Sequence, residues 1–304
     1  MIAGSMVALV TPMDAQGHLD WDSLGKLVDF HLQEGTNAIV AVGTTGESAT
    51  LEVSEHIEVI RRVVDQVNGR IPVIAGCTEH SAGQAIDYIK AAEQIGVDGI
   101  MLLPAVVYRG TDREVLVHYQ TVARATRLPI MIYNNPVSYG VDINLEMTAL
   151  LAEEPNIVAI KESTTDTRRI TELQSRFGDR FQIFCGVDDI ALESVLLGAT
   201  GWISGLTNVF PCESVMLFKL ARAGRIKEAR EIYRWFMPLL RLDTIPTLVQ
   251  CIKLAEQLLG RGSENVRLPR LALQGSERDY VEQVVAQALR NRPDLTSYQA
   301  LLAE

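Results

Sequence analysis

The sequence has little of what a disulfide-bonded, metal-binding or membrane protein needs. Its four cysteines lie far apart without a paired spacing, which argues against a disulfide framework and against a zinc module. The five histidines are scattered, and none belongs to an HExxH motif or a recognisable catalytic triad. No apolar run approaches the roughly 18 residues that span a membrane. We therefore expect reduced thiols, no metal and no membrane segment.

Basic charge is also in short supply. Acidic residues outnumber basic ones by 38 to 28, which gives a formal net charge of −10 and an isoelectric point near 5.1. Such a chain has no general attraction to nucleic acid or anionic lipid, so local donors must hold an anionic substrate. GxGxxG and Walker motifs are absent, so no nucleotide cofactor is indicated. The first residues lack the basic segment of a targeting signal, and we expect a cytoplasmic protein whose partner is a small-molecule substrate.

What the sequence does contain is a regular alternation of short apolar runs and longer amphipathic stretches. Hydrophobic residues make up 47% of the 304 residues, enough for a sizeable core. Runs rich in Val, Ile and Ala are typical of parallel strands buried on both faces, and their alternation with helices predicts repeated βα units. Eight runs predict an α/β fold, a (β/α)8 TIM barrel. The predicted strands are 6–10, 38–42, 71–75, 99–103, 129–133, 157–161, 182–185 and 201–204.

Helical patterns fill the gaps between the predicted strands and continue after the last one. The stretches 22–33 and 55–67 carry apolar stripes of the kind that pack on the outside of a barrel. Only helical stretches follow the eighth strand, with Gly224 and Gly260 as terminators. These later helices are predicted at 211–223, 226–240, 246–259 and 276–291.

The length indicates one catalytic domain with an appendage. A (β/α)8 barrel typically needs about 250 residues, fewer than this chain has. We expect residues 1–223 to form the catalytic barrel domain and residues 224–304 a C-terminal helical segment. The stretch from Arg292 onward has mixed polarity and is expected to be a loosely held tail.

A single lysine ends one of the predicted strands. Lys161 follows the apolar run 157–160, and the carboxyl ends of barrel strands carry the chemistry of this fold. Burial there disfavours the charged amine, lowers its pKa and leaves it able to attack a carbonyl carbon. The alternative is a lysine that merely closes the strand and sits in water, as most lysines do. Lys161 is therefore a candidate Schiff-base former whose role depends on its neighbours.

Two further motifs should open onto the same end of the barrel. GTTGE at 43–47 follows the second strand, and its hydroxyls and backbone N–H groups suit a carboxylate, although a plain tight turn is the alternative. Tyr133 ends the fifth strand, as either a core aromatic or the proton carrier that imine chemistry needs. We assign one of the paired acids Asp188 and Asp189 to a helix start rather than to catalysis.

Taken together, these motifs resemble the pyruvate-type class I aldolase superfamily, which includes dihydrodipicolinate synthase and N-acetylneuraminate lyase. The resemblance covers essentially the whole chain and rests on GTTGES at 43–48, YNNP at 133–136, KES at 161–163 and GVDD at 186–189. It implies a barrel with a C-terminal helical segment, a homotetramer, no cofactor, and an imine between the lysine and pyruvate or another 2-oxo acid.

The resemblance also implies roles for individual residues. The implied catalytic residues are Lys161, the imine former, Tyr133, the proton shuttle, and Thr44, a hydroxyl in the proton path. The implied substrate-binding residues are Thr45, a carboxylate ligand, together with Gly186, Ile203 and Ser138.

Two departures from the synthase pattern bear on the reaction. Val106 stands where the synthase has a tyrosine that completes a hydroxyl relay in the neighbouring subunit. Tyr108 fits that role only if the loop is shifted, and the alternative is a loop or interface aromatic. Ser138 stands where the synthase has an arginine for the second substrate's carboxylate. A serine lacks the charge and the bidentate fork of a guanidinium, so Arg109 is the candidate replacement, with a solvated loop cation as the alternative reading of that residue.

The sequence therefore predicts a Schiff-base lyase acting on a small 2-oxo acid or a cyclic imine acid. The first third, through Gly76, is similar to a synthase, whereas the chain from Cys77 onward is similar to lyases, dehydratases and deaminases. Tyr139 beside Ser138, with TLVQCIKLA at 247–255, favours a catabolic member such as 1-pyrroline-4-hydroxy-2-carboxylate deaminase. The alternatives are 4-hydroxy-tetrahydrodipicolinate synthase of lysine biosynthesis and, in another class, a non-catalytic small-acid-binding pseudoenzyme.

Overall fold

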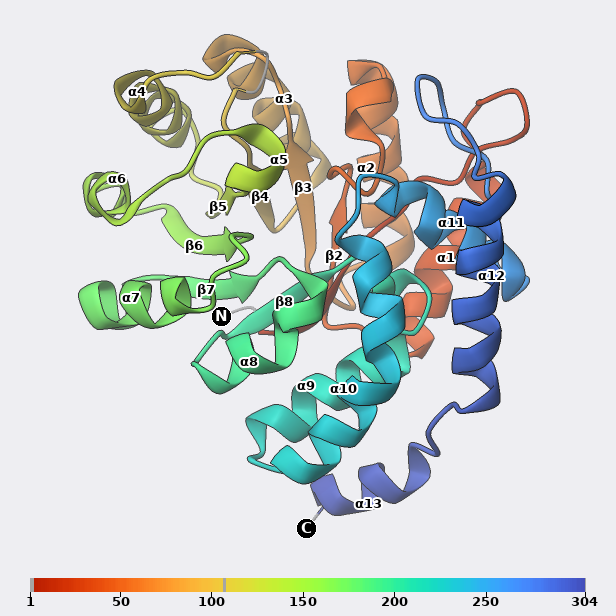
Figure 1. Cartoon of the computed structure of the whole chain (residues 1–304). Helices are drawn as coiled ribbons and strands as arrows, with labels where there is room; N and C mark the ends of the chain where they lie inside the picture. Colours follow the sequence, from red (N-terminus) through yellow and green to blue (C-terminus); the bar gives the residue numbers. More distant parts are fainter. Residues whose placement is uncertain (1–2, 106–107, 304) are drawn as a thin grey trace.

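The computed structural model describes residues 3–105 and 108–303. Its strands are all parallel and close into a barrel in chain order, with the last strand paired to the first (Figure 1). This confirms the predicted (β/α)8 barrel. The strands are β1 (Gly4–Ala8), β2 (Ala38–Ala41), β3 (Val73–Cys77), β4 (Gly99–Leu102), β5 (Ile130–Asn134), β6 (Ile157–Glu162), β7 (Gln182–Cys185) and β8 (Gly201–Ser204).

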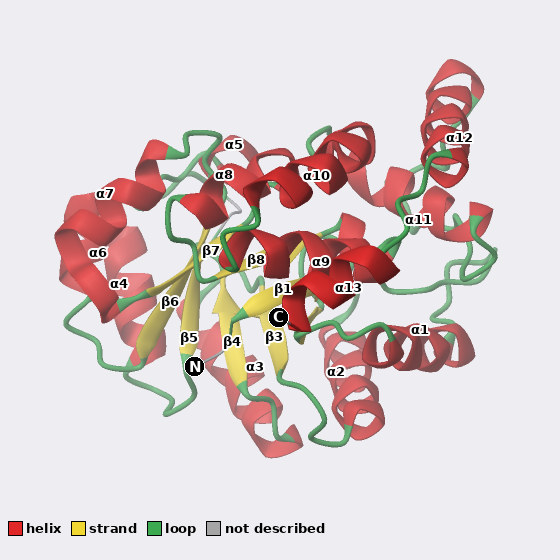
Figure 2. Cartoon of the chain, turned by 90° about the horizontal axis from the view of Figure 1, so that it is seen from below, coloured by secondary structure: helices red, strands yellow, loops and turns green. Residues whose placement is uncertain are grey.

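Helices lie around the strands, which Figure 2 shows gathered in the middle of the molecule. The helices between strands are α1 (Trp21–Gln33), α2 (Val53–Val67), α3 (Ala82–Ile95), α4 (Asp112–Ala123), α5 (Pro136–Tyr139), α6 (Leu145–Leu151), α7 (Arg168–Phe177) and α8 (Ala191–Leu196). After β8 come α9 (Pro211–Arg222), α10 (Ile226–Leu240), α11 (Leu248–Leu258), α12 (Gly275–Arg290) and α13 (Thr296–Ala303). Short 3₁₀ helices include η1 (Ser48–Thr50), η3 (Asp188–Ile190), η4 (Leu206–Asn208) and η5 (Arg241–Asp243).

Strands β1, β3 and β5 begin at other residues than predicted, β5 by only one residue, and backbone donors bear on the bounds of β1 and β3. β1 begins earlier, at Gly4, and it ends before Val10 because the Val10 N–H donates to Asn208 Oδ1 at 3.1 Å instead of to a strand. β3 begins two residues later, after Pro72, which has no N–H to donate to a ladder. The predicted terminators Gly224 and Gly260 both adopt a positive φ of 73°, as helix-ending glycines do.

The barrel interior has its own apolar core beneath the strand ends. Its buried side chains come from alternate positions of the strands and include Met6, Val40, Met131 and Phe184. Phe184 fills the space beside β8 so closely that a Cβ on Gly201 would lie 2.5 Å from its ring. A filled interior leaves the strand ends as the floor of any cavity at the mouth of the barrel.

The helices after β8 pack on one another and on the barrel. α10 packs on α9, and α12 packs on both α10 and α11 (Figure 1). The division into residues 1–223 and 224–304 stays a prediction, because α9 and α10 pack together across it. Residues 296–303 of the expected loosely held tail form α13, which lies against α9, and how firmly this helix is held stays a prediction. At the start of this helix, Asp294 Oδ1 accepts a hydrogen bond from the Thr296 N–H at 2.9 Å.

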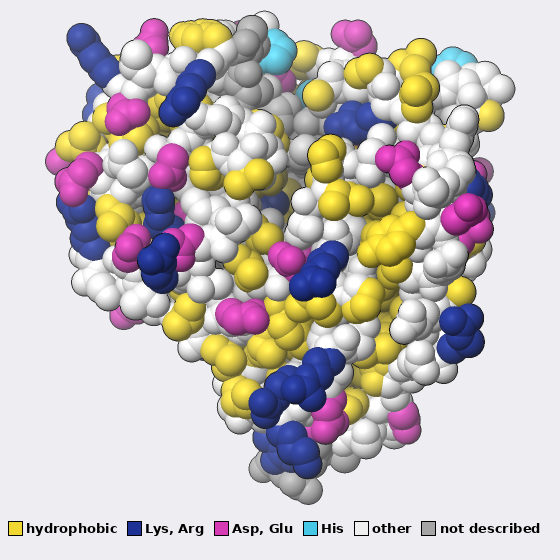
Figure 3. Space-filling view, viewed as in Figure 1, with side chains coloured by type: hydrophobic (Ala, Val, Ile, Leu, Met, Phe, Trp, Pro, Cys, Tyr) yellow, Lys and Arg dark blue, Asp and Glu magenta, His cyan; other side chains and the backbone are white. Residues whose placement is uncertain are grey.

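The surface and the helices agree with the charge and hydropathy of the sequence. Acidic and basic side chains are both spread over the face seen in Figure 3, with hydrophobic side chains between them. Within residues 3–105 and 108–303, no helix is both long enough and apolar enough to cross a membrane.

Candidate active site

One cavity gathers all the residues that the sequence analysis assigned to the site. It has a volume of about 470 Å³ and opens at the carboxyl ends of the barrel strands. The predicted residues that line it are Lys161, Tyr133, Thr44, Thr45, Gly186, Ile203 and Ser138. They come from five strands or the turns after them and, for Ser138, from α5. Barrel closure alone brings these distant segments together, whereas their chemical roles stay predictions.

Lys161 is buried near the end of β6, directly opposite Tyr133 on β5. Its Nζ lies 4.2 Å from the centre of the Tyr133 ring. Burial lowers the pKa of Lys161, and this effect is partly opposed by the nearby carboxyl groups of Asp243 and Asp188. A larger share of the amine is therefore neutral than in an exposed lysine, which is the form that attacks carbonyl carbons.

Three hydroxyl groups lie together beside this amine. Thr44 Oγ1 shares a hydrogen bond with the hydroxyl of Tyr139, and the Tyr139 and Tyr133 rings meet edge to face with centroids 5.8 Å apart. The Tyr133 oxygen accepts from Asn135 Nδ2 at 3.1 Å. Burial raises the pKa of both tyrosines, so each keeps its proton at neutral pH. The group can pass protons along hydroxyls without holding a fixed charge.

Glu47, the last residue of the GTTGE turn, anchors the turn to the C-terminal part of the chain. This residue is fully buried with a φ of 59°, and its carboxylate forms an ion pair with the buried Lys253 of α11. The same carboxylate accepts from the Arg267 N–H at 3.1 Å. Thr11 Oγ1 donates to the Gly46 carbonyl at 2.7 Å. The turn that carries Thr44 is therefore fixed by contacts with the segment after β1, with α11 and with the loop after α11, which sequence reasoning missed.

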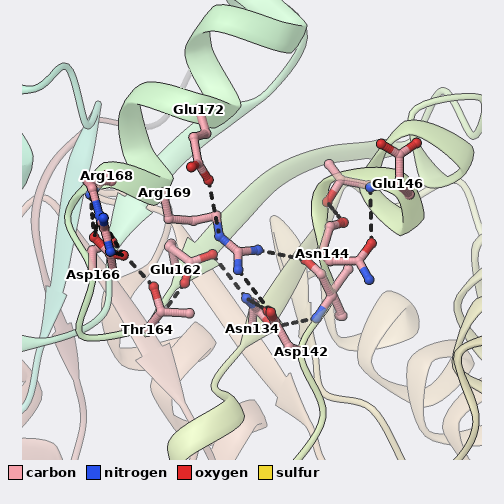
Figure 4. A network of polar contacts seen from close by, with 12 residues as sticks. Asn134, Asp142, Asn144, Glu146, Glu162, Thr164, Asp166, Arg168, Arg169 and Glu172 are labelled. Atoms are coloured by element: carbon pink, nitrogen blue, oxygen red, sulfur yellow. Dashed lines mark hydrogen bonds and ion pairs between the residues drawn. The ribbon is translucent and has the colours of Figure 1, made fainter.

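A second polar network fixes the ends of β5 and β6 (Figure 4). Asn134 Nδ2 donates to Asp142 Oδ1 at 3.1 Å and to Glu162 Oε2 at 3.0 Å. Arg169 donates to the other Asp142 oxygen at 2.9 Å. The Thr164 N–H donates to Glu162 Oε1 at 2.7 Å. Because Asn134 and Glu162 directly follow Tyr133 and Lys161, these bonds hold the two side chains in register.

Asp188 and Asp189 lie in the first turn of η3, so the expected position at a helix start is confirmed, whereas a capping role is not. Neither side chain caps η3 or α8. Asp188 instead accepts from Trp202 Nε1, Ser204 Oγ and the Leu206 N–H at 2.8 to 3.0 Å. Burial raises its pKa to about 6 despite these donors. Asp188 thus ties β7 to β8 behind the cavity, where its carboxyl group also acts on the charge of Lys161.

Two ionisable residues of the cavity went unnoticed in the sequence. Asp243 reaches in from η5, and its Oδ1 lies so close to Gly205 that a Cβ there would be 2.2 Å away. Burial and repulsion from Asp188 raise the pKa of Asp243. Arg270 comes from the loop between α11 and α12 and lines the cavity as well. Neither residue belongs to a local motif, so only the fold reveals them.

The candidate replacements named from the sequence lie elsewhere. Tyr108 is 61% exposed, Arg109 is exposed too, and neither lines the cavity. Val106, the departure from the synthase's loop tyrosine, lies outside the described residues. In the part of the chain that the structure describes, no three His, Cys, Asp or Glu side chains are grouped to hold a metal ion. The site is thus built from an amine, hydroxyls, one carboxyl group and one guanidinium.

Comparison with known sequences identifies the same family throughout the chain. A model described as the dihydrodipicolinate synthetase family matches residues 1–288. A 4-hydroxy-tetrahydrodipicolinate synthase from Stutzerimonas stutzeri (strain A1501) is 46% identical over 287 residues, which are 94% of this chain and 98% of that protein. Another from Pseudomonas aeruginosa is 48% identical over 269 residues, covering 88% of this chain and 92% of the relative.

Solved structures agree with these sequence relatives. The dihydrodipicolinate synthase of Acinetobacter baumannii, in complex with pyruvate, has a TM-score of 0.92 at 36% identity, covering 95% of this chain and 99% of that one. The 4-hydroxy-tetrahydrodipicolinate synthase of Methylacidiphilum fumariolicum SolV has a TM-score of 0.93 at 32% identity, with 99% of both chains covered. The pseudoenzyme alternative is therefore not supported. The chain belongs to the dihydrodipicolinate synthetase family and is an enzyme of the class I type, a lyase that works through a lysine Schiff base.

Proposed function

We propose that Lys161 is the lysine that forms the imine, with pyruvate or a related 2-oxo acid as its partner. The observation that carries this proposal is the buried Lys161 amine, with its lowered pKa, lying 4.2 Å from the centre of the Tyr133 ring. In the proposed step the neutral amine bonds to the keto carbon. The keto oxygen then leaves as water, taking the two protons that the nitrogen gives up.

Tyr133, Thr44 and Tyr139 are the proposed path for those protons. The Tyr133 ring lies beside the amine, and the hydrogen bond between Thr44 and Tyr139 adds two further hydroxyls to the proposed path. Tyr139 comes from the same chain as Lys161. It therefore supplies the relay hydroxyl that the family's synthases take from the loop after the fourth strand, and neither Tyr108 nor a residue at position 106 is needed for it.

The remaining predicted residues form the proposed binding site for the 2-oxo acid. Thr45 offers a hydroxyl and a turn backbone to the carboxylate, as the resemblance implies. A Cβ on Gly186 would lie 2.0 Å from Ser163 Oγ and 2.7 Å from Lys161 Cε, so only glycine leaves room for the lysine. Ile203 lines the floor, and Ser138 lines the side toward α5.

For the overall reaction we propose the condensation carried out by 4-hydroxy-tetrahydrodipicolinate synthases, in which the pyruvate imine attacks aspartate semialdehyde. Relatives with this name are 46% and 48% identical over most of the chain, and they support the synthase better than the deaminase that the sequence analysis favoured. One observation favours a second candidate reaction. Ser138 lines the cavity where the synthase has an arginine, which favours opening of 1-pyrroline-4-hydroxy-2-carboxylate.

Borohydride trapping tests the imine. Reduction in the presence of pyruvate should add the mass of the reduced adduct to Lys161, as seen by intact-protein and peptide mass spectrometry. Lys161→Ala is the control and should gain nothing. A wild-type mass that stays unchanged with pyruvate and with longer 2-oxo acids contradicts the proposed mechanism.

A direct comparison of substrates tests the overall reaction. We expect kcat/KM for pyruvate with aspartate semialdehyde in the range of about 10⁴ M⁻¹s⁻¹ or above, ordinary for an enzyme on its own substrate. Ammonia release from 1-pyrroline-4-hydroxy-2-carboxylate should be at least about 10-fold less efficient, a difference of ~1.4 kcal/mol in transition-state stabilisation. The opposite order of the two values would identify the second candidate as the function.

A further inference from the structure

Arg270 is a cation in the cavity for which the proposed mechanism so far has no use. Its side chain is 22% exposed, and it lines the same cavity as Lys161 and Ser138. Among the described residues that line this cavity, Arg270 carries the only guanidinium, and Lys161 and Asp243 are the other residues with an ammonium or carboxyl group. A partly buried guanidinium facing a substrate cavity is a strong candidate for binding an anion.

The hydrogen-bonding capacity of Arg270 is not used by the protein. Its nearest acidic partner among the described residues is Glu47, whose Oε2 lies 4.0 Å from Arg270 Nη1, beyond hydrogen-bond distance. The Glu47 carboxylate is already occupied by the Lys253 ammonium and by the Arg267 N–H. No side-chain hydrogen bond joins Arg270 to any described residue, so its five N–H donors are open to a ligand.

The backbone holds Arg270 in place without using its side chain. The Arg270 N–H donates to the Arg267 carbonyl at 3.1 Å, which makes a tight turn. The Arg267 guanidinium is bound to Glu55 at 2.6 and 2.9 Å and to the Thr50 carbonyl at 3.0 Å. A loop fixed in this way presents its cation at little entropic cost when a ligand binds.

The cavity therefore has two places for negative charge. The threonines of the GTTGE turn and Lys161 suit the 2-oxo acid end of a substrate, and the 4.0 Å ion pair with Glu47 leaves the hydrogen-bond donors of Arg270 open to a second anion. We propose that Arg270 binds a second carboxylate, at the far end of the substrate, and so takes the role that the arginine missing at position 138 has in the synthases. The enzyme then acts on substrates that are acidic at both ends. This inference rests on the proposed imine at Lys161.

Matched pairs of 2-oxo acids test the role of Arg270 without requiring the full reaction. 2-Oxoglutarate and 2-oxoadipate carry a distal carboxylate, whereas 2-oxopentanoate and 2-oxohexanoate have the same lengths without it. Half-saturating concentrations for borohydride-trapped imine, measured by mass spectrometry, should favour the diacid of at least one pair by roughly 10- to 100-fold, the range for a hydrogen bond between charged groups. Arg270→Met should abolish this preference, and Arg270→Lys should keep part of it.

The controls separate the possible failures. Arg109→Met removes an exposed loop guanidinium outside the cavity and should keep the wild-type preference. Pyruvate serves as the reference ligand, so a variant that folds poorly loses all ligands together and leaves the diacid-to-monoacid ratio unchanged. A wild-type protein without preference for either diacid, or an Arg270→Met protein that retains it, overturns the role of Arg270. Absence of any trapped imine with pyruvate would instead overturn the proposed function.

Discussion

At the residue scale, the chemistry of the cavity depends on how burial divides charge among a few groups. Burial lowers the pKa of Lys161, and it raises the pKa values of Tyr133 and Tyr139. All three pKa shifts favour the neutral forms of these side chains. Protons can therefore move among them without leaving a fixed charge in the buried site. Guanidinium groups such as that of Arg270 bind anions through several N–H donors and are not used for proton transfer.

Local motifs account for the residues of the site that the sequence could predict. Lys161, Tyr133 and the GTTGE threonines each stand at or shortly after a strand end, and a barrel must bring those ends together. Asp243 and Arg270 could not be predicted, because they lie in the short helix η5 and in the loop after α11, whose positions depend on tertiary packing. Arg109 was chosen for its closeness in sequence to the loop in question, and that closeness does not carry it into the cavity.

The hydroxyl path gives a test at single residues. Tyr133→Phe should keep the fold and slow turnover by roughly 10²- to 10⁴-fold, the usual cost of losing an acid–base group. Tyr139→Phe should also slow turnover, because the Thr44 hydroxyl loses its phenol partner. Tyr108→Phe, on an exposed side chain, is the matched control and should be near wild type. Steady-state kinetics would contradict the path in one chain if Tyr108→Phe were slow and Tyr139→Phe normal.

At the scale of elements, the apolar pattern predicts the barrel well because parallel strands are buried on both faces. β7 and β8 have the predicted bounds, and the errors at β1 and β3 come from side-chain and proline effects on single backbone donors. The contact between the GTTGE turn and α11 could not be foreseen. It depends on Glu47 and Lys253, which lie 206 residues apart.

That buried pair makes a prediction about stability. Lys253→Met should leave the Glu47 carboxylate buried without its ammonium partner, which typically destabilises a protein by about 3 to 5 kcal/mol. Urea unfolding measures the loss. Glu47→Gln combined with Lys253→Met removes both charges and should recover part of it.

A surface ion pair supplies the control for this measurement. Arg168 and Asp166 are both largely exposed, so Arg168→Met should change the free energy of unfolding by less than about 1 kcal/mol. If Lys253→Met cost no more than Arg168→Met, the link between α11 and the GTTGE turn would not contribute to stability. If Lys253→Met then lowered turnover while leaving the free energy of unfolding unchanged, the Glu47–Lys253 pair would act only by positioning Thr44.

At the scale of the whole molecule, the site draws on both ends of one chain. The turn after β2, the strands β5 to β8 and the segments around α11 all contribute to one cavity. The family resemblance implies a homotetramer, which stays a prediction that light scattering can check. The position of Tyr139 bears on what an assembly would do, because the hydroxyl proposed for the relay comes from the same chain as Lys161.

Mixed oligomers would show whether subunits complete one another's sites. Chains carrying Lys161→Ala and chains carrying Tyr139→Phe can be co-expressed with two different tags, and oligomers that contain both can be purified in sequence. If Tyr139 serves the Lys161 of its own chain, each active site in the mixture lacks one of the two groups, and turnover should not exceed that of the Tyr139→Phe chains present. Recovery of about a quarter of wild-type turnover, expected when half of the Lys161 sites in a 1:1 mixture regain an intact tyrosine, would show that Tyr139 acts across an interface. The relay would then belong to the assembly rather than to the chain.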